Sequence, residues 1–423
     1  MPPSRLAPLP WRRQRLANGL QVLVVPDTTA GAVAVQMWYR VGAKNDPPGR
    51  SGFAHLFEHM MFKSTRYMAS ETFDRLTEDV GGQNNAYTSE DLTVYQNEVP
   101  SHHLERLLWA EAERLSNLQV EQVHFDSERS VVKEEYRQGV LADPYGRLFH
   151  SLVTLNYERH PYRRPVIGNI DELNLATLAE VRAFHRTWYR PDNALLVVAG
   201  AFEMAQLDVW VERYFAGLAR PLEALPRVRV VEPPRRADKR VTLRAPNVPL
   251  PALALLWQGP ALTHPDGAAL RVAAALLSAG ESSRLNEALV YRRQLAQQAG
   301  FSADLSAEAG MLTAYAVSAA GASLETIEGA LLAQIQALAR GVIPATEIDK
   351  VRSQLLTSAL VRRQTPAGLA AAVGQALMLH GDVRQADREL PQLWAVTAAD
   401  VRRVLQRYVL TRRRVSVNYV SEA

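Results

Sequence analysis

The residues best suited to chemistry lie in one short run, His55-Leu56-Phe57-Glu58-His59. On a helix, positions i and i+4 share a face, with Cβ atoms about 5–6 Å apart. His55 and His59 could therefore direct their ring nitrogens at one metal ion, with Glu58 beside them. The alternative is a buried amphipathic helix in which both histidines are only hydrogen-bonded. The spacing of two histidines does not by itself decide between these interpretations.

A third metal ligand has to come from elsewhere in the chain. Zinc at a catalytic site takes three protein ligands and keeps one position open for water. The chain has no cysteine, so a transition metal would be held by His, Asp or Glu. The best candidates lie in the segment 126–136, which carries Glu128, Glu134 and Glu135.

Helical spacing separates these three glutamates. Glu128 and Glu135 are seven positions apart and share a face, whereas Glu134 points about 100° away from Glu135. A ligand with a second carboxylate behind it is typical of metal sites. The pattern favours Glu135 as the third ligand and Glu128 as its support. The alternative is a solvated helix face that carries all three acids.

Glu58 is suited to a different task. It directly precedes His59 and cannot easily join both histidines on one ion, but it can reach a water that the ion holds. Bound Zn²⁺ lowers the pKa of such a water to about 7. Glu58 can then take the proton and pass it to a leaving amine, which is general acid–base catalysis. These groups predict hydrolysis of an amide bond, with one Zn²⁺ per chain as the cofactor.

Composition fits an ordinary folded enzyme. The chain has 423 residues, of which 47% are hydrophobic, and this length predicts two domains. Its 48 basic and 44 acidic residues are spread along the chain, which argues against nucleic-acid binding. No apolar run is long enough to span a membrane. The N-terminal residues 1–16 lack the apolar core of a signal peptide, so we expect a soluble cytoplasmic chain, or a periplasmic one if a leader was removed.

The elements that must position these residues occur twice. Each half of the sequence predicts two strands, a helix, more strands, long helices and a closing strand, which indicates a duplicated α+β unit. We expect each unit to be a mostly antiparallel or mixed sheet with helices packed on one face. The predicted boundaries are 1–216 for the N-terminal zinc-binding catalytic domain, 217–239 for a Pro- and Arg-rich linker, and 240–423 for a C-terminal domain of the same fold.

Particular segments carry these predictions. Ser51 is expected to cap the helix with the histidines, and residues 83–97 have strand character. The other principal predictions are strands at 20–25, 32–41, 194–200, 240–244, 252–257, 301–305, 311–318 and 414–419, and helices at 70–80, 102–118, 121–140, 178–189, 204–215, 268–277, 324–339 and 346–363.

His-x-x-Glu-His is the motif of inverted zincins, and its surroundings extend the match. Residues 51–62 read SGFAHLFEHMMF, residues 81–88 read GGQNNAYT, and residues 128–135 read ERSVVKEE. On these segments the chain resembles the pitrilysin/insulinase family, and more closely the mitochondrial processing peptidase-like branch. The resemblance covers essentially the whole chain. The family's third ligand follows the motif at a distance that Glu135, 76 positions after His59, matches.

The resemblance implies a fold and a way of binding substrate. Two similar α+β domains form each chain, and two such chains enclose a chamber. Peptides bind extended, as an added strand at the edge after Gly-Gly, which assigns Asn85, Ala86 and Thr88 to substrate binding. Edge addition contacts the peptide backbone, so it suits loose specificity. The alternative for Asn85 is an ordinary residue at the start of a strand.

One departure from the family concerns the second half. That half usually supplies an arginine and a tyrosine, seven apart, which reach the substrate and the developing oxyanion. Val290 and Gln297 stand at those positions here, and the leucine spacing argues against a slip that would bring in Tyr291 or Arg292. In the family's heterodimers one chain holds zinc and its partner supplies the two residues. We therefore expect a heterodimer with a homologous subunit that lacks zinc, and weak or no activity of this chain alone.

The expected function is that of a zinc metalloendopeptidase acting on peptides or unfolded segments inside a two-chain chamber. One alternative is a non-catalytic structural core subunit, which would be expected to lose motif residues. His55, Glu58, His59 and Glu135 are all present, which disfavours it. A second alternative is a peptidase dedicated to maturing one peptide precursor.

Overall fold

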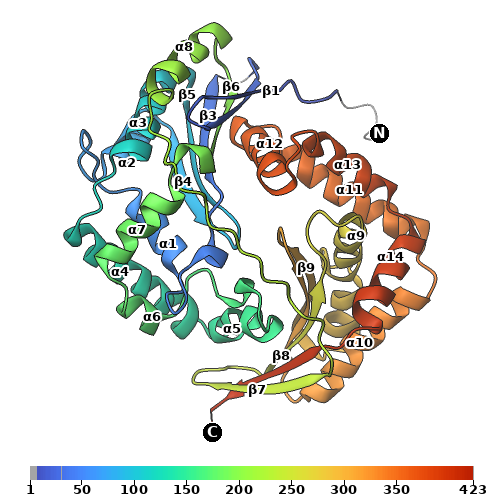
Figure 1. The fold of residues 1–423 in the computed structure, drawn as a ribbon. Helices are drawn as coiled ribbons and strands as arrows, with labels where there is room; N and C mark the ends of the chain where they lie inside the picture. Colours follow the sequence, from blue (N-terminus) through green and yellow to red (C-terminus); the bar gives the residue numbers. More distant parts are fainter. Residues whose placement is uncertain (1–6, 30, 423) are drawn as a thin grey trace.

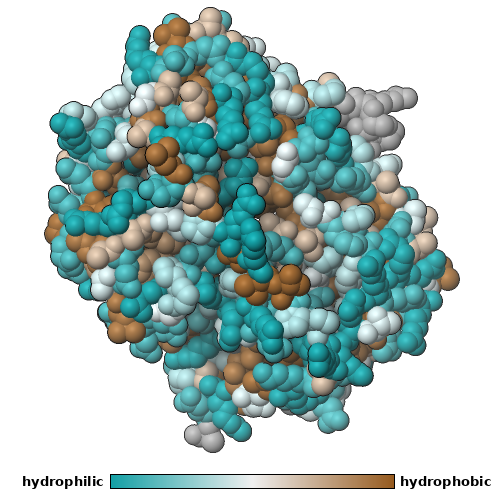
Figure 2. Space-filling view, viewed as in Figure 1, coloured by the Kyte–Doolittle hydropathy of each residue, from teal (hydrophilic) through white to brown (hydrophobic). Residues whose placement is uncertain are grey.

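The computed structural model describes residues 7–29 and 31–422. Each half of the chain builds one mixed β-sheet with helices packed around it (Figure 1). The first half, blue to green, and the second half, yellow to red, lie side by side. In the face drawn in Figure 2, hydrophilic residues cover most of the surface and apolar residues form scattered patches.

The first sheet has the strand order β1-β2-β6-β3-β5-β4. β2 pairs with β6 in parallel, and the other neighbours are antiparallel. This order leaves β4 at an edge. The strands are β1 (Arg12–Arg15), β2 (Gln21–Pro26), β3 (Ala32–Tyr39), β4 (Gln83–Thr88), β5 (Thr93–Pro100) and β6 (Ala194–Gly200).

The second sheet repeats the first without β1. Its order is β7-β11-β8-β10-β9, with β7 and β11 parallel and the other pairs antiparallel. β3 thus corresponds to β8 and the edge strand β4 to β9, which confirms an α+β fold of two similar mixed sheets. The strands are β7 (Lys239–Ala245), β8 (Ala252–Gly259), β9 (Ala296–Leu305), β10 (Gly310–Ser318) and β11 (Val415–Ser421).

Helices follow the strands in a matching order, so that α1 after β3 corresponds to α9 after β8. The first half contains α1 (Phe53–Met60), α2 (Thr72–Glu78), α3 (Leu104–Asn117), α4 (Gln122–Tyr136), α5 (Gly146–Asn156), α6 (Ile170–Asn174), α7 (Leu178–Trp188) and α8 (Met204–Phe215). The second half contains α9 (Gly267–Ser278), α10 (Leu324–Arg340), α11 (Ala345–Arg362), α12 (Pro366–His380), α13 (Gln385–Ala395) and α14 (Ala398–Leu405).

The main core of the first half lies between its sheet and the helices α1, α3, α7 and α8. On α1, Phe53, Leu56, Phe57 and Met60 are all buried. Their spacing forms one apolar stripe on the helix, and each such burial contributes about 1.5–3 kcal/mol. This stripe fixes the rotation of α1 about its axis and therefore the direction of the side chains on its other face.

The second face of each sheet is covered by a helix from the other half. α12 packs Val373 and Leu377 against Trp38 and Leu195 of the first sheet. A Cβ on Gly374 would lie 2.5 Å from the Trp38 ring, so glycine lets this helix approach closely. In return, α5 contributes to the cluster under the second sheet, with Leu148 and Leu152 beside Ala254 and Leu256. The sequence predicts helices on one face of each sheet. The structure has these helices and, in addition, one helix from the other half on the second face of each sheet.

Residues 217–238, between α8 and β7, form neither helix nor strand. They are nevertheless held to the rest of the protein. Arg235 donates to the carbonyl oxygens of Asn156 (2.8 Å) and Leu256 (3.2 Å), and Glu232 accepts from the backbone N–H of His160. We keep residues 217–239 as the proposed linker. Among residues 7–29 and 31–422, no helix has the length and hydropathy to cross a membrane.

A group of charged side chains joins the two halves, and we call Lys44, Asp91, His160 and Glu308 the junction cluster. The Lys44 Nζ atom lies 2.8 Å from Asp91 Oδ1 and 2.7 Å from Glu308 Oε1. The His160 Nε2 atom lies 3.0 Å from Glu308 Oε2. Asp91 also accepts from the backbone N–H of Ala307, in the turn between β9 and β10. The hairpin end of the first sheet is therefore attached to the hairpin end of the second.

Candidate metal centre

The start of α1 is fixed by residues that lie outside the helix. Gly52 has φ +91°, a conformation that favours glycine, and a Cβ there would lie 2.8 Å from the Ile167 carbonyl oxygen. The Asp46 carboxylate accepts from the N–H groups of Gly52 (2.7 Å) and Ala54 (2.8 Å). The prediction that Ser51 caps this helix is therefore wrong, because a carboxylate from the preceding loop bonds the free N–H groups instead.

Three predicted ligands come together. One ligand atom from each of His55, His59 and Glu135 lies within 4.8 Å of the others. The Glu135 Oε2 atom is 3.5 Å from His59 Nε2 and 3.8 Å from His55 Nε2. Tetrahedral zinc with bonds of about 2.1 Å would place its ligand atoms about 3.4 Å apart. The donor set and its spacing therefore fit a zinc ion.

The fourth predicted residue, Glu128, contacts the ring nitrogen of His59 that faces away from Glu135. The Glu128 Oε2 atom lies 3.5 Å from His59 Nδ1, and Lys63 Nζ lies 2.8 Å from Glu128 Oε1. Burial raises the pKa of Glu128, but the bonds to His59 and Lys63 outweigh burial and hold this pKa below its usual value. An ionised Glu128 favours a proton on His59 Nδ1, which leaves Nε2 free to face Glu135.

The two histidines have different surroundings. Burial, with a smaller contribution from His59, lowers the pKa of His55 to about 4. The ring is therefore neutral at pH 7, the form that binds a metal. Burial also lowers the pKa of His59, but the hydrogen bond to Glu128 and the charge of Glu135 outweigh burial and raise it. The exposed Glu134 is bonded to Arg137 at 3.1 Å, outside this group, as the helical spacing predicts.

Glu58 points toward a cleft beside the two histidines. Its Oε2 atom accepts a hydrogen bond of 2.5 Å from Thr88 Oγ1, and burial raises its pKa. The cleft has a volume of about 770 Å³ and is lined by residues of α1, β4 and α5, together with the π-helical turn η4 (Arg137–Ala142) and residues 165–167. His55, Ala86 and Thr88 also line it.

The predicted substrate-binding residues lie on the edge strand β4. Ala86 pairs with Tyr95 and Thr88 with Thr93 of β5, and no strand within residues 7–29 and 31–422 pairs with the other side of β4. The N–H of Ala86 is bonded to the Asn85 side chain at 2.8 Å. The Thr88 hydroxyl is bonded to Glu58, so Thr88 connects this strand to the candidate base.

Sequence reasoning missed several residues at this site. Lys63 lies four positions after His59 but beyond the end of α1 at Met60, so helical spacing gave no signal for its place beside Glu128. Phe149 and His150 line the cleft from α5, and His150 Nε2 is 2.9 Å from the Gly168 carbonyl oxygen. Nothing local to α5 indicates that role, because the cleft forms only when α5 packs beside α1 and β4.

The two positions that depart from the family lie in the second half. Val290 is partly buried against the core of that half, and Gln297 is exposed at the start of β9. Tyr291 is 55% exposed, and Arg292 pairs with Glu287 at 2.5 Å. Among the residues that the structure describes, none of these four side chains lines the cleft beside the histidines.

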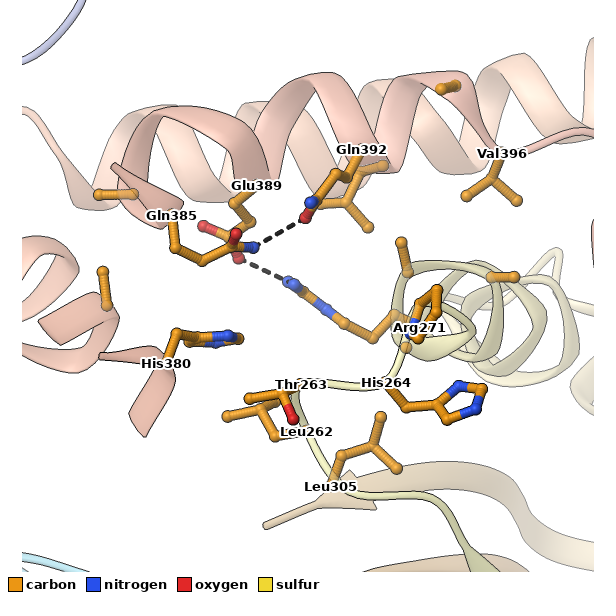
Figure 3. Close-up of a pocket in the computed structure, with 18 of the residues that line it drawn as sticks. Leu262, Thr263, His264, Arg271, Leu305, His380, Gln385, Glu389, Gln392 and Val396 are labelled. Carbon is orange, nitrogen blue, oxygen red and sulfur yellow. Dashed lines mark hydrogen bonds and ion pairs between the residues drawn. The ribbon is translucent and has the colours of Figure 1, made fainter. Parts of the chain in front are cut away.

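A second cavity, of about 500 Å³, lies between α9, α12, α13 and α14 (Figure 3). Its polar groups are largely paired with one another. Arg271 Nη1 is 2.8 Å from Glu389 Oε1, and Gln385 is bonded to Gln392, as Figure 3 shows. Over residues 7–29 and 31–422, the one group of His, Asp and Glu side chains close enough to hold a metal is His55, His59 and Glu135.

Comparison with known proteins agrees with this arrangement. The model of the insulinase family, peptidase family M16, matches residues 21–169, and the model of the M16 inactive domain matches residues 176–355. The zinc protease PqqE of Helicobacter pylori is 32% identical over 340 residues, covering 80% of this chain and 76% of that protein. A probable mitochondrial-processing peptidase subunit beta of Arabidopsis thaliana is 25% identical over 403 residues, covering 93% and 75%.

A solved structure extends the likeness to the fold. The crystal structure of a protease from Helicobacter pylori superposes with a TM-score of 0.94 at 28% identity, covering 98% of this chain and all of that one. The candidate metal ligands His55, His59 and Glu135 lie in the half that the peptidase model matches. The inactive-domain model matches the other half. The chain belongs to the insulinase family of zinc proteases, peptidase family M16.

Proposed function

We propose that this chain is a zinc metalloendopeptidase that cleaves peptides or unfolded segments. The observation that carries the proposal is the meeting of His55, His59 and Glu135 within 4.8 Å of one another. The cleft beside them contains Glu58 and the edge strand β4, so a carboxylate and a place for an extended peptide adjoin the candidate metal ligands.

Each residue of the site has a distinct role in this proposal. His55, His59 and Glu135 hold one zinc ion per chain, and Glu128 orients His59 through its Nδ1–H. When bound, zinc would act as a Lewis acid and would lower the pKa of a water to about 7. Glu58 takes a proton from the attacking water and delivers it to the leaving nitrogen of the peptide bond.

The peptide substrate binds along β4. An extended peptide adds to the free edge of this strand, where Asn85, Ala86 and Thr88 lie. In the free protein Asn85 bonds the Ala86 N–H, and an incoming peptide carbonyl replaces that bond. Recognition of this kind relies on the peptide backbone, so we expect tolerance of many sequences.

The complete enzyme contains a second, homologous subunit that lacks zinc. Val290 and Gln297 cannot provide the guanidinium and phenol that the family brings to the substrate from its second half. The partner supplies this arginine and tyrosine, and the two chains enclose a chamber that admits unfolded segments. Full peptidase activity of the pure chain, measured as a homodimer or monomer, would contradict this part of the proposal.

Two other functions are weighed against this one. A structural core subunit requires no metal group, and the fit of three side chains to zinc geometry disfavours it. A peptidase dedicated to one precursor uses the same chemistry and differs only in substrate. Cleavage of many unrelated peptides at comparable rates would favour the general enzyme over the dedicated one.

Two substitutions test the assignment directly. Glu58→Gln is expected to retain zinc and abolish cleavage of fluorescence-quenched peptides, whereas Glu135→Gln is expected to lose zinc. Glu134→Gln is the matched control, because this neighbouring carboxylate is bonded to Arg137 outside the site. Zinc is measured by atomic absorption after dialysis. An active Glu58→Gln variant would exclude Glu58 as the base, and a zinc-free wild-type chain would favour the structural subunit.

A further inference from the structure

Thr88 links the strand proposed to bind substrate with the proposed base. We propose that Thr88 is a positioning residue, whose hydroxyl fixes the Glu58 carboxylate and ties it to β4. The inference rests on the proposed function, in which Glu58 is the base and β4 receives the peptide. It assigns Thr88 a role other than direct contact with the substrate.

The contact between the two side chains is short and directional. Thr88 Oγ1 donates to Glu58 Oε2 at 2.5 Å. Hydrogen bonds to an ionised acceptor are shorter and stronger than neutral ones. Among the described residues, no hydrogen bond reaches Glu58 Oε1. With one oxygen held by Thr88, the other is available to accept a proton from water.

On its inner side, Thr88 lies next to a buried threonine of β5. Its Oγ1 lies 3.3 Å from Thr93 Oγ1, directly across the β4–β5 pair. The Thr93 hydroxyl donates to the Val41 carbonyl oxygen at 3.0 Å. Thr88 Oγ1 therefore packs against a buried threonine whose own hydroxyl is fixed by the Val41 carbonyl oxygen.

The end of β4 that carries Thr88 is also the anchored end. In the turn that follows, the Ser89 carbonyl oxygen accepts from the Ala43 N–H at 3.0 Å, and the Glu90 carbonyl oxygen accepts from the Lys44 N–H at 3.1 Å. A Cβ on Gly42 would lie 2.4 Å from the Ser89 carbonyl oxygen, so this contact leaves no free space. Asp91, in the same turn, belongs to the junction cluster.

These contacts place the base and the substrate strand in one rigid frame. A peptide that adds to β4 is aligned by the backbone atoms of that strand. Thr88, the last residue of the same strand, orients Glu58. Loss of the Thr88 hydroxyl leaves the backbone edge intact and frees the carboxylate to rotate. Substrate binding should therefore persist while the chemical step slows.

The test compares Thr88→Val, which removes the hydroxyl at constant shape, with Thr88→Ser, which keeps it. Each full-length, zinc-loaded chain is assayed on a fluorescence-quenched nonapeptide, together with its partner subunit where one co-purifies. For Thr88→Val we expect kcat to fall about 10–100-fold, which is less than the roughly 10²–10⁴-fold that general acid–base catalysis contributes, because Glu58 itself remains. KM and zinc content should stay close to the wild-type values, and Thr88→Ser should restore most of kcat.

A matched control exists in the second sheet. Thr313 is buried in β10, and its hydroxyl has no hydrogen-bond partner among the described residues. Thr313→Val is therefore expected to leave kcat and KM unchanged. If Thr88→Val proves unstable, Thr88→Ala removes the same hydroxyl and should show the same selective loss of kcat.

The outcomes separate this inference from the proposed function. Wild-type kcat in Thr88→Val, with an inactive Glu58→Gln variant, overturns the role of Thr88 alone. A raised KM at unchanged kcat also overturns it, and assigns Thr88 to substrate binding. An active Glu58→Gln variant overturns the proposed base itself. A selective fall in kcat that serine reverses supports the inference.

Discussion

The two halves of this protein share a sheet topology and differ in what their corresponding helices carry. α1 follows β3 and bears His55, Glu58 and His59, whereas α9 follows β8 and carries Arg271 as its one charged residue. Val272 and Leu276 of α9 are buried in the core of the second half. Over the residues that the structure describes, the same architecture therefore brings possible metal ligands together in the first half and not in the second.

The second long helix after each hairpin differs in the same way. On α4, Glu135 faces the two histidines. On α11, which occupies the corresponding place, Glu347 is paired with Arg284 at 2.7 Å. A carboxylate beside two imidazoles favours a metal cation, whereas one neutralised by arginine does not. The fold supplies the positions, and a few side chains decide which half can hold a metal.

The largest expected effect comes from removing a ligand in the first half. His59→Gln should lose zinc and all measurable peptide cleavage, because two remaining ligands hold zinc poorly. Arg271→Met, on the corresponding helix of the second half, should keep both. Zinc content and cleavage of a quenched peptide are the measurements. Equal losses in the two variants would break the distinction between the halves.

A smaller effect is expected from the helices that the halves exchange. Leu377→Ala in α12 and Leu152→Ala in α5 each remove a buried side chain, at an expected cost of about 2–5 kcal/mol in the free energy of unfolding. Because each helix completes the other half's core, urea denaturation should show one cooperative transition. Two separate transitions in the wild-type chain would show that the halves unfold independently.

The smallest effect sharpens the role of the residues behind the ligands. Lys63→Met removes the cation bonded to Glu128, and partners of this kind typically change metal affinity about 10–100-fold. The dissociation constant for zinc, measured by competition with a chelating dye, should rise by that factor. Lys350→Met in the second half removes a lysine that is bonded to Ser282, far from Glu128 in the sequence, and should not change the dissociation constant for zinc. Unchanged affinity in Lys63→Met would exclude the support role.

Local patterns were sufficient for the elements that carry the site. His55 and His59 are four positions apart on α1, and Glu128 and Glu135 are seven apart on α4, so helical periodicity alone placed each pair on one face. The duplication of the α+β unit followed from the repeated order of strands and helices, whereas the strand order of each sheet did not. The segment 83–97 was predicted as strand-like and forms the hairpin of β4 and β5.

Contacts between distant segments could not be predicted in this way. Asp46 bonds the start of α1 from a loop, and Thr88 reaches Glu58 from a neighbouring strand. Neither contact leaves a periodic trace in the sequence. The predictions also omitted α5 and α12. α12 is apolar on nearly all sides, as expected of a helix buried between two layers, but its sequence does not specify which sheet it covers.

The exchange of α5 and α12 has a consequence for how such a chain could have arisen. A single ancestral unit, lacking the helix that its copy provides, would leave one face of its sheet open to water. Two identical units that exchange this helix would form a domain-swapped, two-fold symmetric dimer. Fusion of the two genes would then preserve the swap within one polypeptide and free one copy to lose its ligands. On this view, fragments cut within residues 217–239 should bind each other more readily than they fold alone.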